Sequence, residues 1–169
     1  MMYKFLISLI FSSFVFFVAN SQVLINEYTG ANYDTYTDNY GEYEDWVELY
    51  NPTAAAIDLN GWALSDKDSN PLKWIFPSSF IVPANGTVII YCSGRDEIIG
   101  GNAHSNFKIT QTKGNEVLML SDASGVFQDS IRVSPNQNSH TRGRETNGAV
   151  IWSVFTAGTP NANNVGAMQ

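Results

Sequence analysis

The stretch from Asp45 to Asp66, "DWVELYNPTAAAIDLNGWALSD", decides the fold of this chain. It contains short apolar runs separated by turn residues, and it shows no spacing typical of catalytic side chains. In its first run, "DWVELY", Val47 and Leu49 fall on one side of an extended chain and their neighbours on the other. This alternation predicts a β-strand with two different faces.

Other segments of the chain have the same strand character. They are short, rich in β-branched and aromatic residues, and bounded by clusters of Gly, Pro, Asn and Asp. They are "VLINEY" (23–28), "GWALSD" (61–66), "TVIIYCS" (87–93), "EVLMLSD" (116–122), "VFQDSIRV" (126–133) and "AVIWSVF" (149–155). Apolar residues nowhere keep helical spacing over ten or more residues. We therefore predict an all-β sandwich or barrel, with a hairpin turn at Gly125.

The N-terminus has the pattern of a cleaved export signal. A short basic start and an apolar run over residues 5–19 precede Ala19-Asn20-Ser21, which fits the small-x-small cleavage pattern. A retained anchor is the alternative, but the run is short for a membrane span of about twenty residues. We predict a signal peptide over residues 1–21, cleaved between Ser21 and Gln22. The product is then secreted, periplasmic or at the cell surface, with no transmembrane span.

The charge balance argues against nucleic acid as a partner. The chain has a net charge of −7, and loss of Lys4 with the signal peptide leaves eight basic against sixteen acidic residues. A surface that neutralises phosphates is not expected from this composition.

The single cysteine and the two histidines give no sign of a reactive or metal site. Cys92 lies in the apolar run "TVIIYCS", which predicts a buried thiol with no intramolecular disulfide. His104 and His140 have no neighbouring ligand at metal-binding spacing, so we expect both in surface loops. The glycine-containing segment 94–101, "GRDEIIGG", is expected to be a flexible loop between strands.

The order of short motifs along the chain resembles the lamin tail domain family, an immunoglobulin-like β-sandwich also found in exported bacterial proteins. The motifs are "INEY" (25–28), "DWVELYNP" (45–52), "IDLNGWALSD" (57–66), "WIFP" (74–77), "NGTVIIYCS" (85–93), "NFKIT" (106–110), "GNEVLMLSDASGVFQDSI" (114–131), "TRGRETNGAVIW" (141–152) and "TPNANN" (159–164). The resemblance implies such a sandwich over residues 22–164, with 165–169 a tail or the start of a linker to a further domain. The chain departs from the family pattern in the insertion 29–44 and in Thr141, where Ser is common.

Six residues are expected to have structural roles. They are Glu27, Trp46, Trp62, Trp74, Arg144 and Trp152. Trp62 and Trp74 are predicted to lie in the core, and the other two tryptophans at its edge. A buried Glu27 needs donors, such as a backbone amide, Arg144 or Arg142, because an unpaired buried carboxylate is costly. Arg144 matches the arginine of the family's "SxGR" pattern, which implies either a tie between the last and first strands or a contact to an acidic ligand.

The insertion "TGANYDTYTDNYGEYE" (29–44) is the one segment that predicts ligand contacts. Candidate calcium ligands are Asp34, Asp38, Glu42, Glu44 and Asp45, although their spacing does not match a calcium loop and a solvated acidic face is the alternative. Candidate aromatic contacts to a glycan or a protein are Tyr33, Tyr36, Tyr40 and Tyr43. Apart from calcium, no cofactor is expected.

Two functions remain open. The first is a non-catalytic binding or adhesion module of an exported bacterial protein, which recognises a protein, glycan or envelope partner through loops or sheet edges. The alternative is the accessory N-terminal domain of a larger secreted enzyme, a hydrolase, a nuclease or a spore-coat-H-like kinase, with its catalytic domain beyond residue 169. This chain contains no nucleophile motif, so we expect it to turn over no substrate by itself.

Overall fold

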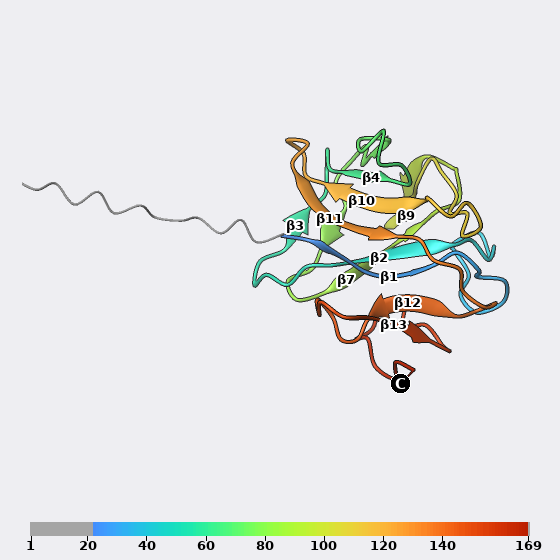
Figure 1. Ribbon diagram of the computed structural model, residues 1–169. Coiled ribbons are helices and arrows are strands. Elements are labelled where there is room, and N and C mark those ends of the chain that lie inside the picture. The colour runs from blue at the N-terminus through green and yellow to red at the C-terminus, as the bar shows by residue number, and fades with distance from the viewer. Residues whose placement is uncertain (1–21, 169) are drawn as a thin grey trace, which may run out of the picture.

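The computed structural model describes residues 22–168, and this part of the chain is built from strands without a helix (Figure 1). The strands are β1 (Leu24–Thr29), β2 (Trp46–Tyr50), β3 (Ile57–Asp58), β4 (Ala63–Ser65), β5 (Trp74–Ile75), β6 (Ile81–Val82), β7 (Thr87–Tyr91), β8 (Glu97–Ile99), β9 (Asn102–His104), β10 (Val117–Ser121), β11 (Phe127–Arg132), β12 (Thr141–Arg144) and β13 (Trp152–Phe155). Within this range there is no helix of the length and apolarity that a membrane span requires. The predicted signal peptide lies outside the described residues.

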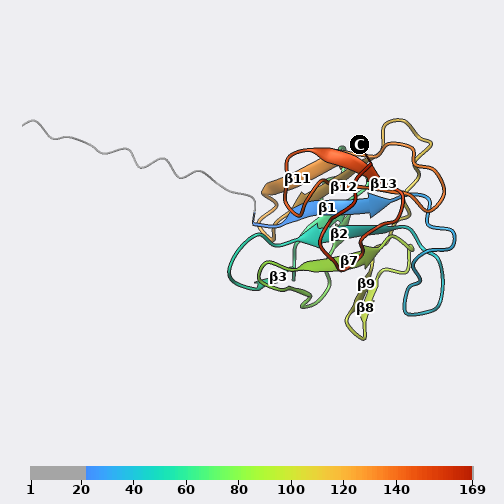
Figure 2. The ribbon, with the colours of Figure 1, turned by 90° about the horizontal axis from the view of Figure 1, so that it is seen from below.

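The strands form two large sheets and a small ribbon. The larger sheet has the order β13-β12-β1-β2-β7-β9-β8, the smaller sheet the order β11-β10-β4-β5, and β3 pairs with β6 alone. Neighbouring strands are antiparallel except β7 and β9, which are parallel. The two large sheets lie against each other and share one core (Figures 1 and 2). This arrangement confirms the predicted all-β sandwich.

The alternation in β2 gives the larger sheet its two faces. Val47 and Leu49 lie in the main core between the sheets. Trp46 instead packs with Ile89 and Tyr91 in a separate cluster. Because side chains alternate along a strand, this second cluster lies on the face that points away from the smaller sheet, which we call the outer face.

The main core consists largely of side chains from segments that the strand pattern identifies. Trp62 is 5% exposed and Trp74 is 1% exposed, and both lie in this core. Leu64, Leu118 and Leu120 of the smaller sheet are fully buried beside them. Burial of each such aliphatic side chain contributes about 1.5–3 kcal/mol to stability, so the core can hold the sandwich without a disulfide.

A bulge in β1 decides which residues of the first strand reach the outer face. The register with β2 shifts between Ile25 and Glu27, which leaves Asn26 as an extra residue. Glu27 therefore lies opposite Glu48 on the outer face, while Tyr28 turns into the main core. Without the bulge, simple alternation would place Glu27 in the core.

Residues 156–164, which we call the C-terminal strap, follow β13. The strap crosses the outer face over β1 and β2 (Figure 2). Its backbone N–H groups at Thr159 and Asn161 donate hydrogen bonds to Glu27 and Glu48. The strap therefore covers the middle of the outer face, over β1 and β2.

Comparison with the sequence-based expectations shows where strand patterns fail. Each of the seven segments predicted as strands contains a strand, and the hairpin at Gly125 (φ 76°) joins β10 to β11. The flexible loop expected over residues 94–101 is wrong, because this segment contains β8 and turns into β9 through Gly100 and Gly101, both at positive φ. The other strands that the pattern missed have two to four residues, too few to show alternation.

Candidate functional site

Tyr36, from the insertion, is the centre of an aromatic cluster on the outer face. Its ring stacks on Tyr91 of β7, with the ring centroids 6.3 Å apart, and meets Trp46 of β2 edge-on at 6.2 Å. Its hydroxyl accepts a hydrogen bond of 2.7 Å from the side-chain amide of Asn161 in the strap. Three separate elements thus fix the position of this tyrosine.

An open groove of about 370 Å³, which we call the Tyr36 groove, lies beside this ring. Its lining residues are Tyr36, Ser79, Phe80, Ile81, Val88, Ile89, Tyr91, Ile98, Gly101, Asn102 and Asn161. None of these side chains carries a charge, although the chain as a whole has a net charge of −7. The groove combines aromatic and aliphatic walls with amide and hydroxyl groups, which is the usual composition of a pocket for a neutral ligand.

The other tyrosines of the insertion do not join this groove. Tyr33 and Tyr43 are 64% and 48% exposed. The Tyr40 hydroxyl donates a 2.7 Å hydrogen bond to Glu97, and the Arg95 guanidinium lies 4.3 Å from the centre of the Tyr40 ring. Of the four tyrosines predicted to contact a ligand, only Tyr36 joins the aromatic cluster in the described chain, and the other three lie at separate surface positions. The sequence does not identify Tyr91 and Asn161 as site residues, because both are far from Tyr36 along the chain and meet it only in the folded protein.

The carboxylates of the insertion are spread over separate local contacts. Asp38 accepts backbone hydrogen bonds from Tyr40 and Glu42, and Glu44 forms an ion pair of 2.9 Å with Lys108. Asp45 accepts a hydrogen bond from the Asn32 backbone, Asp34 accepts one from Ser139, and the Glu42 side chain is exposed. Within residues 22–168, no three His, Cys, Asp or Glu side chains come together as metal ligands would. Calcium binding by this loop stays a prediction from the sequence.

Glu27 and Glu48 form a pair of buried carboxylates on neighbouring strands. Both are fully buried. Glu27 accepts hydrogen bonds from the Thr141 hydroxyl and from the backbone and hydroxyl of Thr159, the latter at 2.6 Å. Glu48 accepts hydrogen bonds from the Asn26 amide at 2.8 Å and from the Asn161 backbone at 2.7 Å. Of the donors expected for Glu27, a backbone amide is found, that of Thr159. The expected arginine contact is wrong, because the hydroxyls of Thr141 and Thr159 supply the other hydrogen bonds.

Burial controls the protonation of this pair. Removal from water raises the pKa of Glu48 to about 7 and also raises the pKa of Glu27, although their hydrogen bonds act in the opposite direction. Two carboxylates with shifted pKa values are typical of acid–base catalysis. Here, however, the strap covers both groups and uses their oxygens. The arrangement fastens the strap and offers a ligand no free carboxylate oxygen.

Arg144 lies where β12 meets both β1 and the smaller sheet. Its Nε donates a 2.8 Å hydrogen bond to the carbonyl oxygen of Ile25, and its Nη2 forms a 2.8 Å ion pair with Asp129 of β11. Nη1 donates to the carbonyl oxygen of Ala149, and the guanidinium lies 5.1 Å from the centre of the Trp152 ring. These contacts connect three strands and leave the guanidinium directed inward.

His104 and Cys92 are both buried. The expectation of a surface loop is wrong for His104, which lies in β9 and is bonded through one ring nitrogen to Asn39 at 2.7 Å and through the other to Ser93 at 3.0 Å. Burial lowers its pKa, so the ring is neutral near pH 7. Burial raises the pKa of the Cys92 thiol, as expected for an unreactive core cysteine. Neither side chain is available to a ligand.

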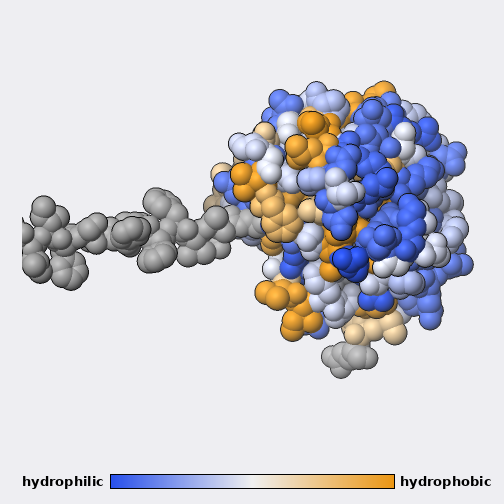
Figure 3. Space-filling model, turned by 45° about the horizontal axis from the view of Figure 1, so that its top comes forward, coloured by the Kyte–Doolittle hydropathy of each residue, from blue (hydrophilic) through white to orange (hydrophobic). Residues whose placement is uncertain are grey.

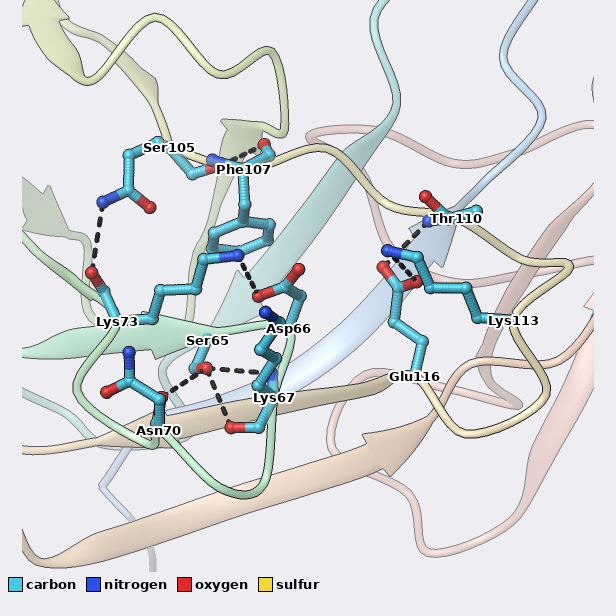
Figure 4. A network of polar contacts seen from close by, with 11 residues as sticks. Ser65, Asp66, Lys67, Asn70, Lys73, Ser105, Phe107, Thr110, Lys113 and Glu116 are labelled. Atoms are coloured by element: carbon cyan, nitrogen blue, oxygen red, sulfur yellow. Dashed lines mark hydrogen bonds and ion pairs between the residues drawn. The ribbon is translucent and has the colours of Figure 1, made fainter.

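A second group of polar contacts lies away from the outer face (Figure 4). Lys73 forms a 2.6 Å ion pair with Asp66, and its ammonium lies 5.1 Å from the centre of the Phe107 ring. Glu116 accepts a 2.8 Å hydrogen bond from the Thr110 backbone and pairs with Lys113 at 3.5 Å. These bonds connect loops of the sandwich to one another, so we interpret this group as structural.

Apolar exposure alone does not identify a binding face. Figure 3 shows hydrophilic residues over much of one end of the molecule and apolar residues gathered nearer the other end. Large exposed hydrophobic side chains come from separate elements, such as Phe127 in β11, Ile75 in β5 and Ile151 before β13. Such scattered residues are normal on protein surfaces. The Tyr36 groove differs from such scattered residues because it combines aromatic walls with uncharged polar groups in one hollow.

Comparison with known families agrees with the architecture. The family model described as Lamin Tail Domain matches residues 18–135, which is more than half of the chain. The matched range includes β1 to β11 and the insertion, whereas β12, β13 and the strap follow it. A search of the curated proteins found no match.

Proposed function

The chain belongs to the lamin tail domain family, and from this premise we propose that it is a non-catalytic binding module of an exported protein. Its partner is then a protein, a glycan or another component of the cell envelope or surface. The net charge of −7 supports a partner other than nucleic acid, because an acidic surface repels phosphates.

The observation that carries this proposal is the Tyr36 groove. Its walls come from the insertion, β6, β7, the β8–β9 hairpin and the strap, so the folded sandwich holds its shape before any ligand arrives. A preformed groove costs a ligand little ordering free energy. Aromatic rings beside amide groups, such as Tyr91 beside Asn102 and Asn161, suit recognition by stacking and hydrogen bonding.

The buried glutamates support a role without catalysis. A general acid or base must come within hydrogen-bond reach of the reacting group. The pKa values of the buried Glu27 and Glu48 are both raised, but their oxygens accept hydrogen bonds from Thr159 and Asn161. In our proposal these residues hold the strap that borders the groove.

The proposal is tested by the retention of the secreted domain on cell-envelope material. The domain, fused to a fluorescent protein, is incubated with the insoluble envelope fraction of its own host, and the bound fraction is measured. The Ile81→Asp variant places a charge in the groove at a side chain that is 49% exposed. We expect a loss of about tenfold or more in affinity, because a charge is costly to desolvate against an apolar wall.

Ile151→Asp is the matched control. Ile151 is 62% exposed and does not line the groove, so its variant should be retained like the wild type. Absence of any retention of the wild-type domain on envelope material would contradict the proposed function. Equal retention of both aspartate variants would show that another face makes the contact.

A further inference from the structure

A second hollow of about 250 Å³, which we call the Trp46 hollow, shares Tyr36 with the Tyr36 groove. Its other walls include Trp46, Thr141 and the strap residues Ala157, Gly158 and Pro160. The strap thus contributes Pro160 to this hollow and the next residue, Asn161, to the groove. The two hollows flank the bond between Tyr36 and Asn161 and present one ligand with two adjoining positions.

The Trp46 hollow contains an unpaired donor. Trp46 is 1% exposed, and its indole Nε1 makes no hydrogen bond within the described part of the chain. A Cβ atom built on Gly158 would lie 3.4 Å from Cζ2 of Trp46. The six-membered ring of the indole therefore packs beside Gly158, and Trp46 and Gly158 line the hollow together. A buried donor without an acceptor destabilises the fold, and a ligand oxygen that accepts its hydrogen bond removes this penalty.

The lining chemistry specifies a neutral ligand with hydroxyl groups. None of the residues that line either hollow is charged, in a chain with a net charge of −7, so a carboxylated or sulfated ligand has no cation to meet. The Trp46 N–H requires an acceptor, while the Tyr36 ring, Ala157 and Pro160 present apolar surface. A sugar ring offers both, because its C–H face is apolar and its rim carries hydroxyl oxygens.

The size of the Trp46 hollow favours a single ring. Pockets for drug-sized ligands measure about 300–1,000 Å³, and this hollow of about 250 Å³ lies just below that range. A peptide side chain of comparable size, such as an aromatic one, would fill the space but would bring few acceptors to the indole N–H. A hexose ring brings several.

We propose that the Trp46 hollow is a subsite for one ring of a neutral oligosaccharide, whose hydroxyl oxygen accepts the Trp46 N–H while the neighbouring ring occupies the Tyr36 groove. This inference rests on the proposed function, since it assigns a chemical class to the ligand of the same face. It also gives the strap a role in recognition, because Ala157, Pro160 and Asn161 then touch the ligand.

The direct test follows the indole N–H of Trp46 by nuclear magnetic resonance. The chain contains four tryptophans, and loss of one indole signal in Trp46→Phe assigns the Trp46 resonance. The secreted wild-type chain is titrated with a panel of neutral oligosaccharides of two to six units. We expect at least one sugar to shift the Trp46 signal in a saturable way. If no neutral sugar in the panel moves that signal, the inference is overturned.

Affinity of the identified sugar for variants gives an independent readout. Ala157 is exposed at the hollow, so Ala157→Leu should block the hollow without disturbing the core. We expect Trp46→Phe and Ala157→Leu each to weaken sugar binding by about tenfold, as loss of one hydrogen bond or of access would. Ala123→Leu, at an exposed alanine in the β10–β11 hairpin of the other sheet, is the matched control and should bind normally. Equal affinities for Ala157→Leu and Ala123→Leu would contradict the subsite.

Treatment of the envelope material separates failure of this inference from failure of the proposed function. Periodate oxidises neighbouring hydroxyl groups of sugars and leaves the peptide backbone intact, whereas a protease does the reverse. Loss of retention after periodate alone supports the sugar subsite. Loss after protease alone overturns the subsite and leaves a protein-binding module. No retention before either treatment removes both proposals.

Discussion

At the scale of single residues, Arg144 connects the strands around it through the shape of its guanidinium as well as through its positive charge. Its Nε, Nη1 and Nη2 donate to three different acceptors, which belong to β1, to the segment before β13 and to β11. The side chain is 8% exposed, so water cannot replace a lost partner without entering the core edge. A lysine ammonium is a single point of charge and cannot span these three directions.

We therefore expect Arg144→Lys to lower the free energy of unfolding by about 1–3 kcal/mol. Asp129 would keep at most one ionic partner, and the carbonyl oxygens of Ile25 and Ala149 would lose their donor. Urea unfolding measures the change. Arg142→Lys is the control, since Arg142 makes one long hydrogen bond of 3.2 Å to Pro135. Identical unfolding curves for Arg144→Lys and the wild type would disprove the role of Arg144 as a tie between strands.

Asn26 marks the limit of what residue patterns predict. The sequence "VLINEY" alternates through Ile25, and continued alternation would bury Glu27 in the core and expose Tyr28. The bulge instead places Glu27 on the outer face, beneath the strap, and Tyr28 in the main core. No residue in the segment predicts a bulge. The Asn26 side chain is held there by hydrogen bonds to residues far away in the sequence, among them Asn147 and Asn164. The pairing of Glu27 with Glu48 therefore could not be predicted from the sequence.

At the scale of elements, the C-terminal strap is held by polar bonds rather than by apolar packing. Asn164 donates hydrogen bonds to the carbonyl oxygen of Arg144 at 2.7 Å and to that of Asn26 at 3.3 Å. Glu27 and Glu48 anchor the middle of the strap. Strands with strong alternation could be located from the sequence, but "TPNANN" has no periodicity, so its path across the sheet could not. For the same reason, the sequence identifies Tyr36 and Trp46 as candidate residues but does not predict the site that they form together.

The raised pKa values of Glu48 and Asp45 should make the stability of the domain depend on pH. The pKa of Glu48 is raised from 4.5 to about 7 and that of Asp45 from 3.8 to about 6, so the folded state retains protons that the unfolded state has released. Stability is then highest at the acidic end of this window, falls as the pH rises through it, and levels off above pH 7. We expect the free energy of unfolding to be roughly 1–3 kcal/mol lower at pH 8 than at pH 5.

Urea unfolding of the wild type and two glutamine variants at several pH values tests whether Glu48 causes this pH dependence. Glu48→Gln removes the titrating group and should flatten the slope, at the cost of a mismatched hydrogen bond to Asn26 or Asn161. Glu42→Gln changes an exposed side chain and should keep the wild-type slope. A wild-type stability that is constant or rises between pH 5 and pH 8 would contradict the assignment, as would an unchanged slope in Glu48→Gln.

At the scale of the whole molecule, the two faces of the larger sheet have different roles. The inner face of the larger sheet supplies the main core, and its outer face carries the strap and the two uncharged hollows. The fold class could be predicted because it depends on strand patterns repeated along the chain. The site could not, because the insertion, β7 and the strap meet only after the sheet has formed.

The extent of the mature chain is the last prediction. We expect cleavage between Ser21 and Gln22, since Ala19 and Ser21 are the small residues of the cleavage pattern. Val23 is fully buried in the main core, so we expect the mature chain to retain it. Mass spectrometry of the secreted product is the suitable measurement, since an N-terminal glutamine cyclises and blocks chemical sequencing. Ala19→Leu should prevent processing, whereas Asn20→Leu, at the tolerant middle position, should be processed normally. An exported chain that still begins at Met1 would show that the segment is a retained anchor. Equal processing of the two variants would show that cleavage occurs elsewhere.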